Sequence, residues 1–91
     1  MNTKYKILLL KEQKKIGEVV ANPDFSDIKI YITLSMQKEY KPVLERLIRN
    51  IIEREKLNCS YNNLRIKNST KMFWAIFTQS LMLDLGILIT E

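Results

Sequence analysis

The segment from residue 42 to residue 56 constrains the fold most strongly, because it has the pattern of an amphipathic helix. Its apolar residues occur as adjacent pairs one helical turn apart: Val43 and Leu44, Leu47 and Ile48, Ile51 and Ile52. In a helix these pairs cover about half of the surface, and mostly charged side chains cover the other half. The rest of the chain is therefore expected to supply an apolar surface on which this helix packs.

The start of this helix has two interpretations. Pro42 fits the first helical turn, where its missing N–H costs nothing. Alternatively, Ser35 caps a helix that begins earlier, and Pro42 then introduces a kink.

Two segments before this helix predict strands of different kinds. Residues 5–10 form a short apolar run between two lysines, which predicts a strand that is buried on both faces and central in a sheet. Residues 28–34 alternate between apolar and polar side chains, which is typical of an antiparallel strand with one buried face.

Residues 16–20 lie between these two segments and can be read in two ways. The density of β-branched side chains favours a strand that returns along residues 5–10, with Gly17 at a bulge. The alternative is a short helix, because Ile16, Val19 and Val20 also have helical spacing. Gly17 would weaken such a helix, so the hairpin is preferred.

The segments after residue 56 predict shorter elements around a second helix. Residues 58–63 are expected to form a polar loop, residues 64–67 a short edge strand, and residues 87–90 a last strand. Residues 71–85 predict a helix with an unusually large apolar surface. Asn68, Ser69 and Thr70 are good N-cap residues for it, and Gly86 suits the position just past its end.

These elements predict a single α+β domain over residues 1–91. An N-terminal three-stranded antiparallel meander and one or two short strands would form the sheet, with both helices packed on one face. The chain is short enough for one domain, and neither a linker nor an internal repeat is visible.

Several classes of chemistry are disfavoured by the composition. The chain has no histidine and one cysteine, Cys59, so imidazole acid–base catalysis, an intrachain disulfide and a zinc site of paired cysteines are excluded. Its two glycines do not form a phosphate-binding loop. We therefore expect a protein that is not an enzyme, needs no cofactor or metal, and resides in a reducing cytoplasmic compartment.

The charge favours an acidic partner, with nucleic acid or a nucleic-acid-processing complex as the first choice. The formal net charge is +5 and the sequence pI is about 9.4. Lys29 and Tyr31 are expected on the wet face of one strand, where a cation and an aromatic ring can hold a phosphate and a base. The predicted nucleic-acid-binding residues are Lys4, Lys6, Lys29, Tyr31, Arg65 and Lys67.

The alternative is a protein–protein inhibitor or adaptor that does not contact nucleic acid, including a protein that associates with itself. Large apolar side chains of the second helix are typical of interface anchors. The predicted partner-interface residues are Phe73, Trp74, Phe77 and Met82.

A third and weaker hypothesis is a membrane anchor formed by residues 72–89. The segment is about long enough to cross a bilayer. Gln79 and Asp84 lie inside it, however, and Gly86 divides it where a helix is expected to end.

Overall fold

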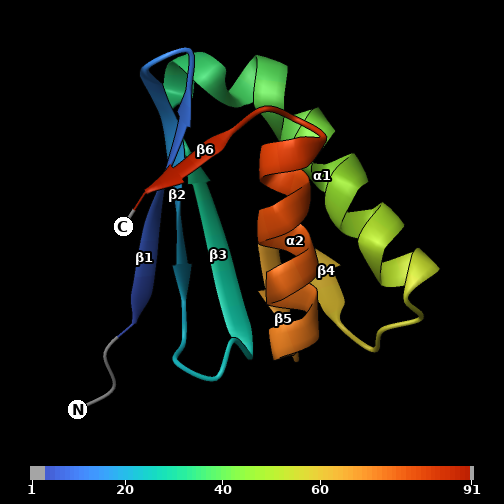
Figure 1. The fold of residues 1–91 in the computed structure, drawn as a ribbon. Helices are drawn as coiled ribbons and strands as arrows, with labels where there is room; N and C mark the ends of the chain where they lie inside the picture. Colours follow the sequence, from blue (N-terminus) through green and yellow to red (C-terminus); the bar gives the residue numbers. More distant parts are fainter. Residues whose placement is uncertain (1–3, 91) are drawn as a thin grey trace.

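The computed structural model describes residues 4–90 and contains a six-stranded antiparallel sheet with two helices (Figure 1). Along the chain the elements are β1 (Tyr5–Lys11), β2 (Lys14–Ala21), β3 (Asp27–Ile32), a 3-10 turn η1 (Leu34–Met36), α1 (Gln37–Arg54), β4 (Ser60–Asn62), β5 (Arg65–Lys67), α2 (Lys71–Leu83) and β6 (Leu88–Thr90). The strand order across the sheet is β4-β5-β3-β2-β1-β6. The predicted α+β class and the N-terminal β1-β2-β3 meander are confirmed.

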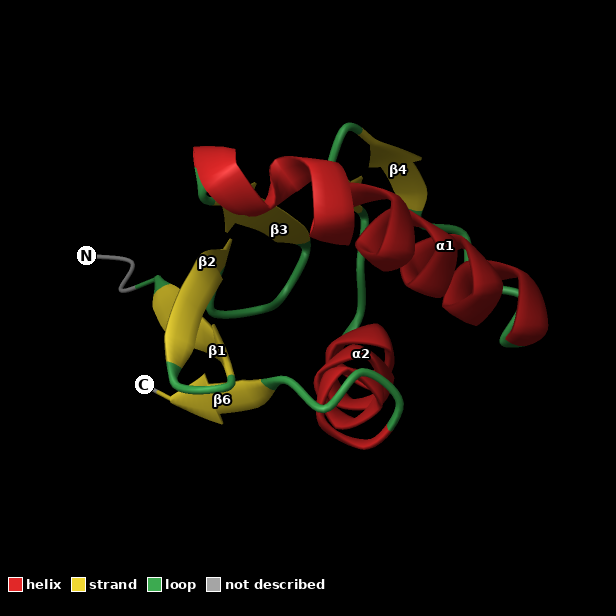
Figure 2. Ribbon diagram, turned by 90° about the horizontal axis from the view of Figure 1, so that it is seen from above, coloured by secondary structure: helices red, strands yellow, loops and turns green. Residues whose placement is uncertain are grey.

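Both helices cover the same face of the sheet. The sheet curves, and α1 and α2 lie on its inner side (Figure 2). Alternate residues of the strands, for example Leu9, Val19 and Ile30, form one apolar cluster with Ile48 of α1 and Phe77 of α2. The alternate apolar residues of the strands and the apolar faces of α1 and α2 therefore pack into one core.

The helix α1 begins at Gln37 and not at Pro42, so the earlier start is the correct interpretation. Met36 occupies the N-cap position without a side-chain hydrogen bond, and Ser35 lies inside η1. Pro42 is therefore inside the helix, where it cannot donate to the carbonyl of Lys38.

The expectation that β1 is buried on both faces is wrong. β1 has a strand on each side, β2 and β6, but the helices cover only one of its faces. Ile7 and Leu9 point into the core, whereas Leu8 and Leu10 point to the uncovered face and are half-buried. An apolar run in the sequence does not show whether one or both faces of the strand are covered. In β1, one of the two apolar faces remains at the surface.

The β3 strand is shorter than the alternation suggested. It ends at Ile32, and Leu34, which was expected to continue the buried row, is 87% exposed in η1. The chain leaves the sheet after Thr33, whose N–H still donates to the carbonyl of Ile16 at 3.0 Å. The turn into α1 therefore places Leu34 outside the sheet, although the alternation predicted that it would continue the buried row.

The β5 strand is internal, and the edge strand is β4, which the sequence had suggested to be loop. A tight turn at Asn63 and Leu64, which have φ values of 51° and 62°, folds the chain back on itself. Two consecutive residues with positive φ are typical of a two-residue hairpin turn. The turn lacks glycine, which explains why the hairpin was missed.

The hairpin of β1 and β2 is confirmed, and the short-helix alternative is wrong. The register between them shifts by one residue between Leu9 and Leu10, opposite Gly17, which agrees with the expected bulge. The α2 helix begins at Lys71, and its N-cap Thr70 accepts a hydrogen bond from the N–H of Phe73 at 3.2 Å. It ends at Leu83, two residues earlier than expected.

The segment after α2 turns sharply into β6. Gly86 has a φ of +64°, and the N–H of Ile87 donates to the carbonyl of Leu81 at 2.9 Å; because the C-cap of α2 is Asp84, Gly86 lies two residues past the cap and not, as the sequence had suggested, directly past the helix end. Within residues 4–90, neither helix combines the length and the apolar character that a bilayer crossing requires.

Candidate nucleic-acid-binding face

The strand register brings five of the six predicted nucleic-acid-binding residues to one face of the sheet. Lys6 pairs with Val20, Val20 with Lys29, and Lys29 with Arg65, so these side chains form one row across four strands. Paired residues in a sheet point to the same face. We call the side opposite to the helices the open face.

Tyr31 and Lys67 also lie on the open face. Each is two residues along its strand from a member of the row, Tyr31 from Lys29 and Lys67 from Arg65, and the side-chain period in a strand is two. Lys4 precedes β1 and is exposed, but it lies outside the paired strands. The sequence therefore predicted correctly that Lys29 and Tyr31 share the face of β3 opposite to its buried residues, although it could not predict the row.

Two of the cations are paired with carboxylates. The Arg65 guanidinium donates to both oxygens of Asp27, at 3.1 Å and 3.0 Å. These hydrogen bonds hold the pKa of Asp27 below its ordinary value and raise the pKa of Arg65. The Nζ atom of Lys6 lies 3.1 Å from Oε2 of Glu18, whose pKa is also lowered.

The remaining strand lysines on this part of the open face are available to a ligand. Within residues 4–90, neither Lys29 nor Lys67 forms an ion pair with a carboxylate. Both are close enough to Asp27 for their charges to contribute to its low pKa. Asp27 thus lies among three cations, Lys29, Arg65 and Lys67, and the local charge is positive.

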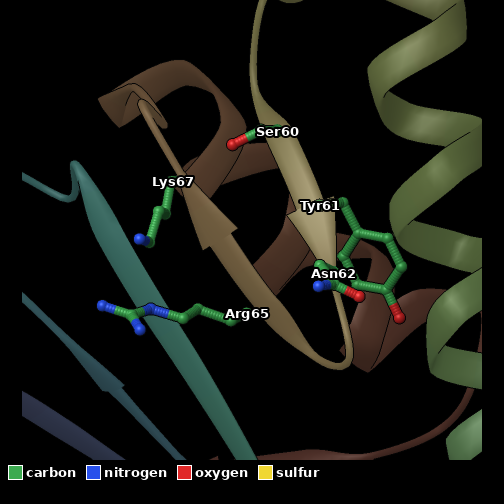
Figure 3. A pocket seen from close by; sticks show the side chains of 5 residues that line it. All are labelled: Ser60, Tyr61, Asn62, Arg65 and Lys67. Carbon is green, nitrogen blue, oxygen red and sulfur yellow. The ribbon is translucent and has the colours of Figure 1, made fainter.

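A shallow hollow of about 270 Å³ lies at this cationic end of the sheet (Figure 3). Ser60, Tyr61, Asn62, Arg65 and Lys67 line it, and the Arg65 and Lys67 side chains extend over β3. The side chain of Tyr61 points to the other side, toward α1, where the guanidinium of Arg49 lies 5.7 Å from its ring centroid. Tyr61 therefore fixes the hairpin to the helix and does not present its ring to the open face.

The aromatic ring that the open face presents is that of Tyr31. Its residue is 52% exposed and lies next to the cationic row. The opposite end of the open face is apolar: Leu8, Leu10 and the 62% exposed Leu88 come from β1 and β6. The sequence had assigned Leu8 and Leu10 to a buried layer, so this apolar half was not expected.

The four predicted partner-interface residues do not form one surface. Phe73 and Phe77 are completely buried in the core, with their ring centroids 5.6 Å apart, so neither is available to a partner. Trp74 and Met82 line a groove of about 340 Å³ between α2 and β1. Tyr5 also lines this groove.

An aromatic stack that the sequence did not predict includes two residues that line this groove, Tyr5 and Trp74. The ring centroids of Tyr5 and Phe25 are 5.3 Å apart, and those of Phe25 and Trp74 are 4.9 Å apart. Phe25 comes from the turn between β2 and β3 and has a positive φ of 62°. No local signal in the sequence pairs this turn with α2.

Within the described part of the chain, no three of its Cys, Asp and Glu side chains are grouped so that they could hold a metal ion. Burial raises the pKa of the Cys59 thiol, which disfavours the reactive thiolate.

The sequence matches no protein-family model, and neither a curated protein nor a solved structure matches it significantly. The open face is therefore the main basis for a functional proposal.

Proposed function

We propose that this protein is a non-catalytic binding protein that uses the open face of its sheet to bind nucleic acid, alone or within a nucleic-acid-processing complex. The observation that supports this most is the row of Lys6, Lys29 and Arg65, with Lys67 and Tyr31 beside it. Phosphates are neutralised by such cations, and their counterions are released on binding. We also propose a reducing cytoplasmic location, on the basis of the single cysteine.

The cations of this face should contribute unequally. Arg65 and Lys6 already have carboxylate partners, which must be displaced or shared when a phosphate binds. Lys29 and Lys67 have no such competitor among the described residues. For single strands, each phosphate contact changes the logarithmic salt dependence of binding by about −0.7, so these two lysines account for about −1.4.

Charge reversal tests this proposal. The double variant Lys29→Glu/Lys67→Glu should lower the affinity for a labelled oligonucleotide by about 10-fold or more at about 50 mM salt and reduce the salt dependence. Fluorescence anisotropy at several salt concentrations measures both quantities. The matched control, Lys38→Glu/Arg46→Glu, makes the same change in net charge at exposed positions on α1, which lies on the other side of the sheet.

The control separates a specific face from a general charge effect. If both double variants weaken binding equally, the open face has no special role. If the unmodified protein binds no nucleic acid at low salt, the proposed function is wrong.

A second candidate function is protein binding, which the groove between α2 and β1 favours. Trp74, Met82 and Tyr5 provide apolar and aromatic surface there, and Met82 is 47% exposed. Such a groove could mediate association of two copies. A sedimentation coefficient that rises with concentration, and that Met82→Glu makes independent of concentration, would favour this function.

A further inference from the structure

The C-terminal half of β3 has no partner strand on the side where β5 pairs with its N-terminal half. β5 pairs with Asp27, Ile28 and Lys29, and the last contact is a 2.9 Å hydrogen bond from the N–H of Ile30 to the carbonyl of Leu64. Beyond this point β3 continues to Ile32 with only β2 beside it. The first turns of α1 and the β4–β5 turn enclose the space that remains.

This space is a hollow of about 400 Å³, which we call the edge notch. It is lined by residues of β3, of the first turns of α1 and of the β4–β5 turn: Ile30, Tyr31, Ile32, Gln37, Lys41, Asn63 and Leu64. The carbonyl of Ile32 accepts a hydrogen bond of 3.4 Å from Nε2 of Gln37. Because Thr33 donates toward β2, the N–H of Ile32 points in the opposite direction, toward the notch.

The groups around the edge notch match the parts of a nucleotide. The Asn63 amide, the oxygen of the Gln37 amide and the backbone N–H of Ile32 offer donors and acceptors to the edge of a base, whereas Nε2 of Gln37 already donates to the carbonyl of Ile32. Lys41 offers a cation to a phosphate, and the exposed ring of Tyr31 offers a surface for stacking. A peptide strand fits less well, because only two residues of β3 remain unpaired there.

The notch is continuous with the open face through Tyr31. That residue lines the notch and also lies on the open face beside the row that contains Lys29 and Arg65. The hollow lined by Arg65 and Lys67 lies along the strands of the same β4–β5 hairpin, whose turn lines the notch. A chain of phosphates held by the open face can therefore pass the hairpin and reach the notch.

We infer that the protein binds single-stranded nucleic acid and holds one nucleotide in the edge notch, with the base stacked on Tyr31. The inference rests on the proposed function, and it adds the strandedness of the ligand and a contact site on α1. A duplex would not fit, because its bases are already stacked and their edges are paired. The sequence did not suggest Gln37, Lys41 or Asn63 as contact residues.

Oligonucleotides of about 12 residues, single-stranded and as a duplex of the same sequence, provide the probes. Tyr31→Leu should weaken binding of the single strand by about 5-fold to 100-fold, because a stacking surface is lost. Lys41→Gln should weaken it too and reduce the salt dependence by about 0.7. The controls are Tyr5→Leu, an exposed tyrosine on the other side of the sheet, and Lys38→Gln, an exposed lysine in the first turn of α1.

A second measurement does not depend on variants. Addition of a nucleoside monophosphate to the isotope-labelled protein should shift the backbone amide of Ile32 and the side-chain amides of Gln37 and Asn63 in an NMR spectrum. Shifts restricted to the cationic row, with none at these three residues, would overturn the inference.

The outcomes distinguish this inference from the proposed function. If duplex and single strand bind equally, and Tyr31→Leu binds like the unmodified protein while Lys29→Glu/Lys67→Glu does not, the edge notch is not a nucleotide site and the proposed function remains. If the unmodified protein binds neither probe, both are overturned.

Discussion

Replacement of Gly17 by alanine should destabilise this protein severely, because two strand backbones meet at this position. A β-carbon at Gly17 would lie 2.2 Å from the carbonyl oxygen of Tyr31 and 3.1 Å from the Cα of Ile32. Neither neighbour is a flexible side chain, so β2 and β3 would have to separate locally. Overpacking of a core costs about 1–3 kcal/mol. Each ladder hydrogen bond that is strained adds about 1 kcal/mol.

We therefore expect Gly17→Ala to lower the free energy of unfolding by about 3 kcal/mol. For a domain of this size, 1 kcal/mol corresponds to about 4–8 °C, so the melting temperature should fall by about 12–24 °C. Urea denaturation followed by circular dichroism measures the free energy, and a thermal melt provides an independent estimate. The same change should also displace the backbone of Tyr31, whose side chain lies on the proposed binding face.

The other glycine provides the control. A β-carbon at Gly86 meets no atom within 4 Å, so Gly86→Ala would pay only for the left-handed backbone conformation, at φ +64°. That conformation costs about 1–2 kcal/mol for an alanine. If Gly17→Ala loses less than about 1 kcal/mol, or less than Gly86→Ala, the argument from backbone contact is refuted.

Two further predictions concern single hydrogen-bonding groups. Thr70→Ala should lower the free energy of unfolding by about 1 kcal/mol, because the N–H of Phe73 loses its cap, and Thr70→Ser should restore most of it in the same urea titration. The pKa of Asp27 is held below its ordinary 3.8 by Arg65, so the stability that this pair contributes is complete above that pH and is lost as the pH falls through the lowered pKa. Asp27→Asn should therefore lose less stability than the unmodified protein between neutral pH and about pH 2; an equal loss in both proteins would show that the pair does not stabilise the fold.

The sequence determined most of the secondary structure and the fold class. The paired apolar residues of α1 and the alternation from Ile28 to Ile32 require only that each element bury one side, and the structure confirms both. Thr70 likewise marks the start of α2 through its own local chemistry, whereas α2 ends at Leu83, before the position that Gly86 suggested. Such signals depend only on residues that are close in the sequence, so they can be recognised without knowledge of the tertiary contacts.

Only the tertiary structure decided the neighbours of each element. β4 was missed because a hairpin turn at Asn63 and Leu64 carries no glycine, and β1 was misjudged because Leu8 and Leu10 remain on the uncovered face. These features depend on which strand lies beside which, and a strand's own residues do not encode that choice.

The same division applies to the candidate site. Positive charge and one exposed tyrosine were visible in the sequence, but their arrangement in one row depends on the register of four strands. Which cations are neutralised, as Arg65 is by Asp27, depends on contacts between residues 38 positions apart. The alternation from residue 28 to residue 32 thus determined which side chains of β3 face water, whereas the pairing of the strands decided which side chains meet, because register and pairing are properties of the whole sheet.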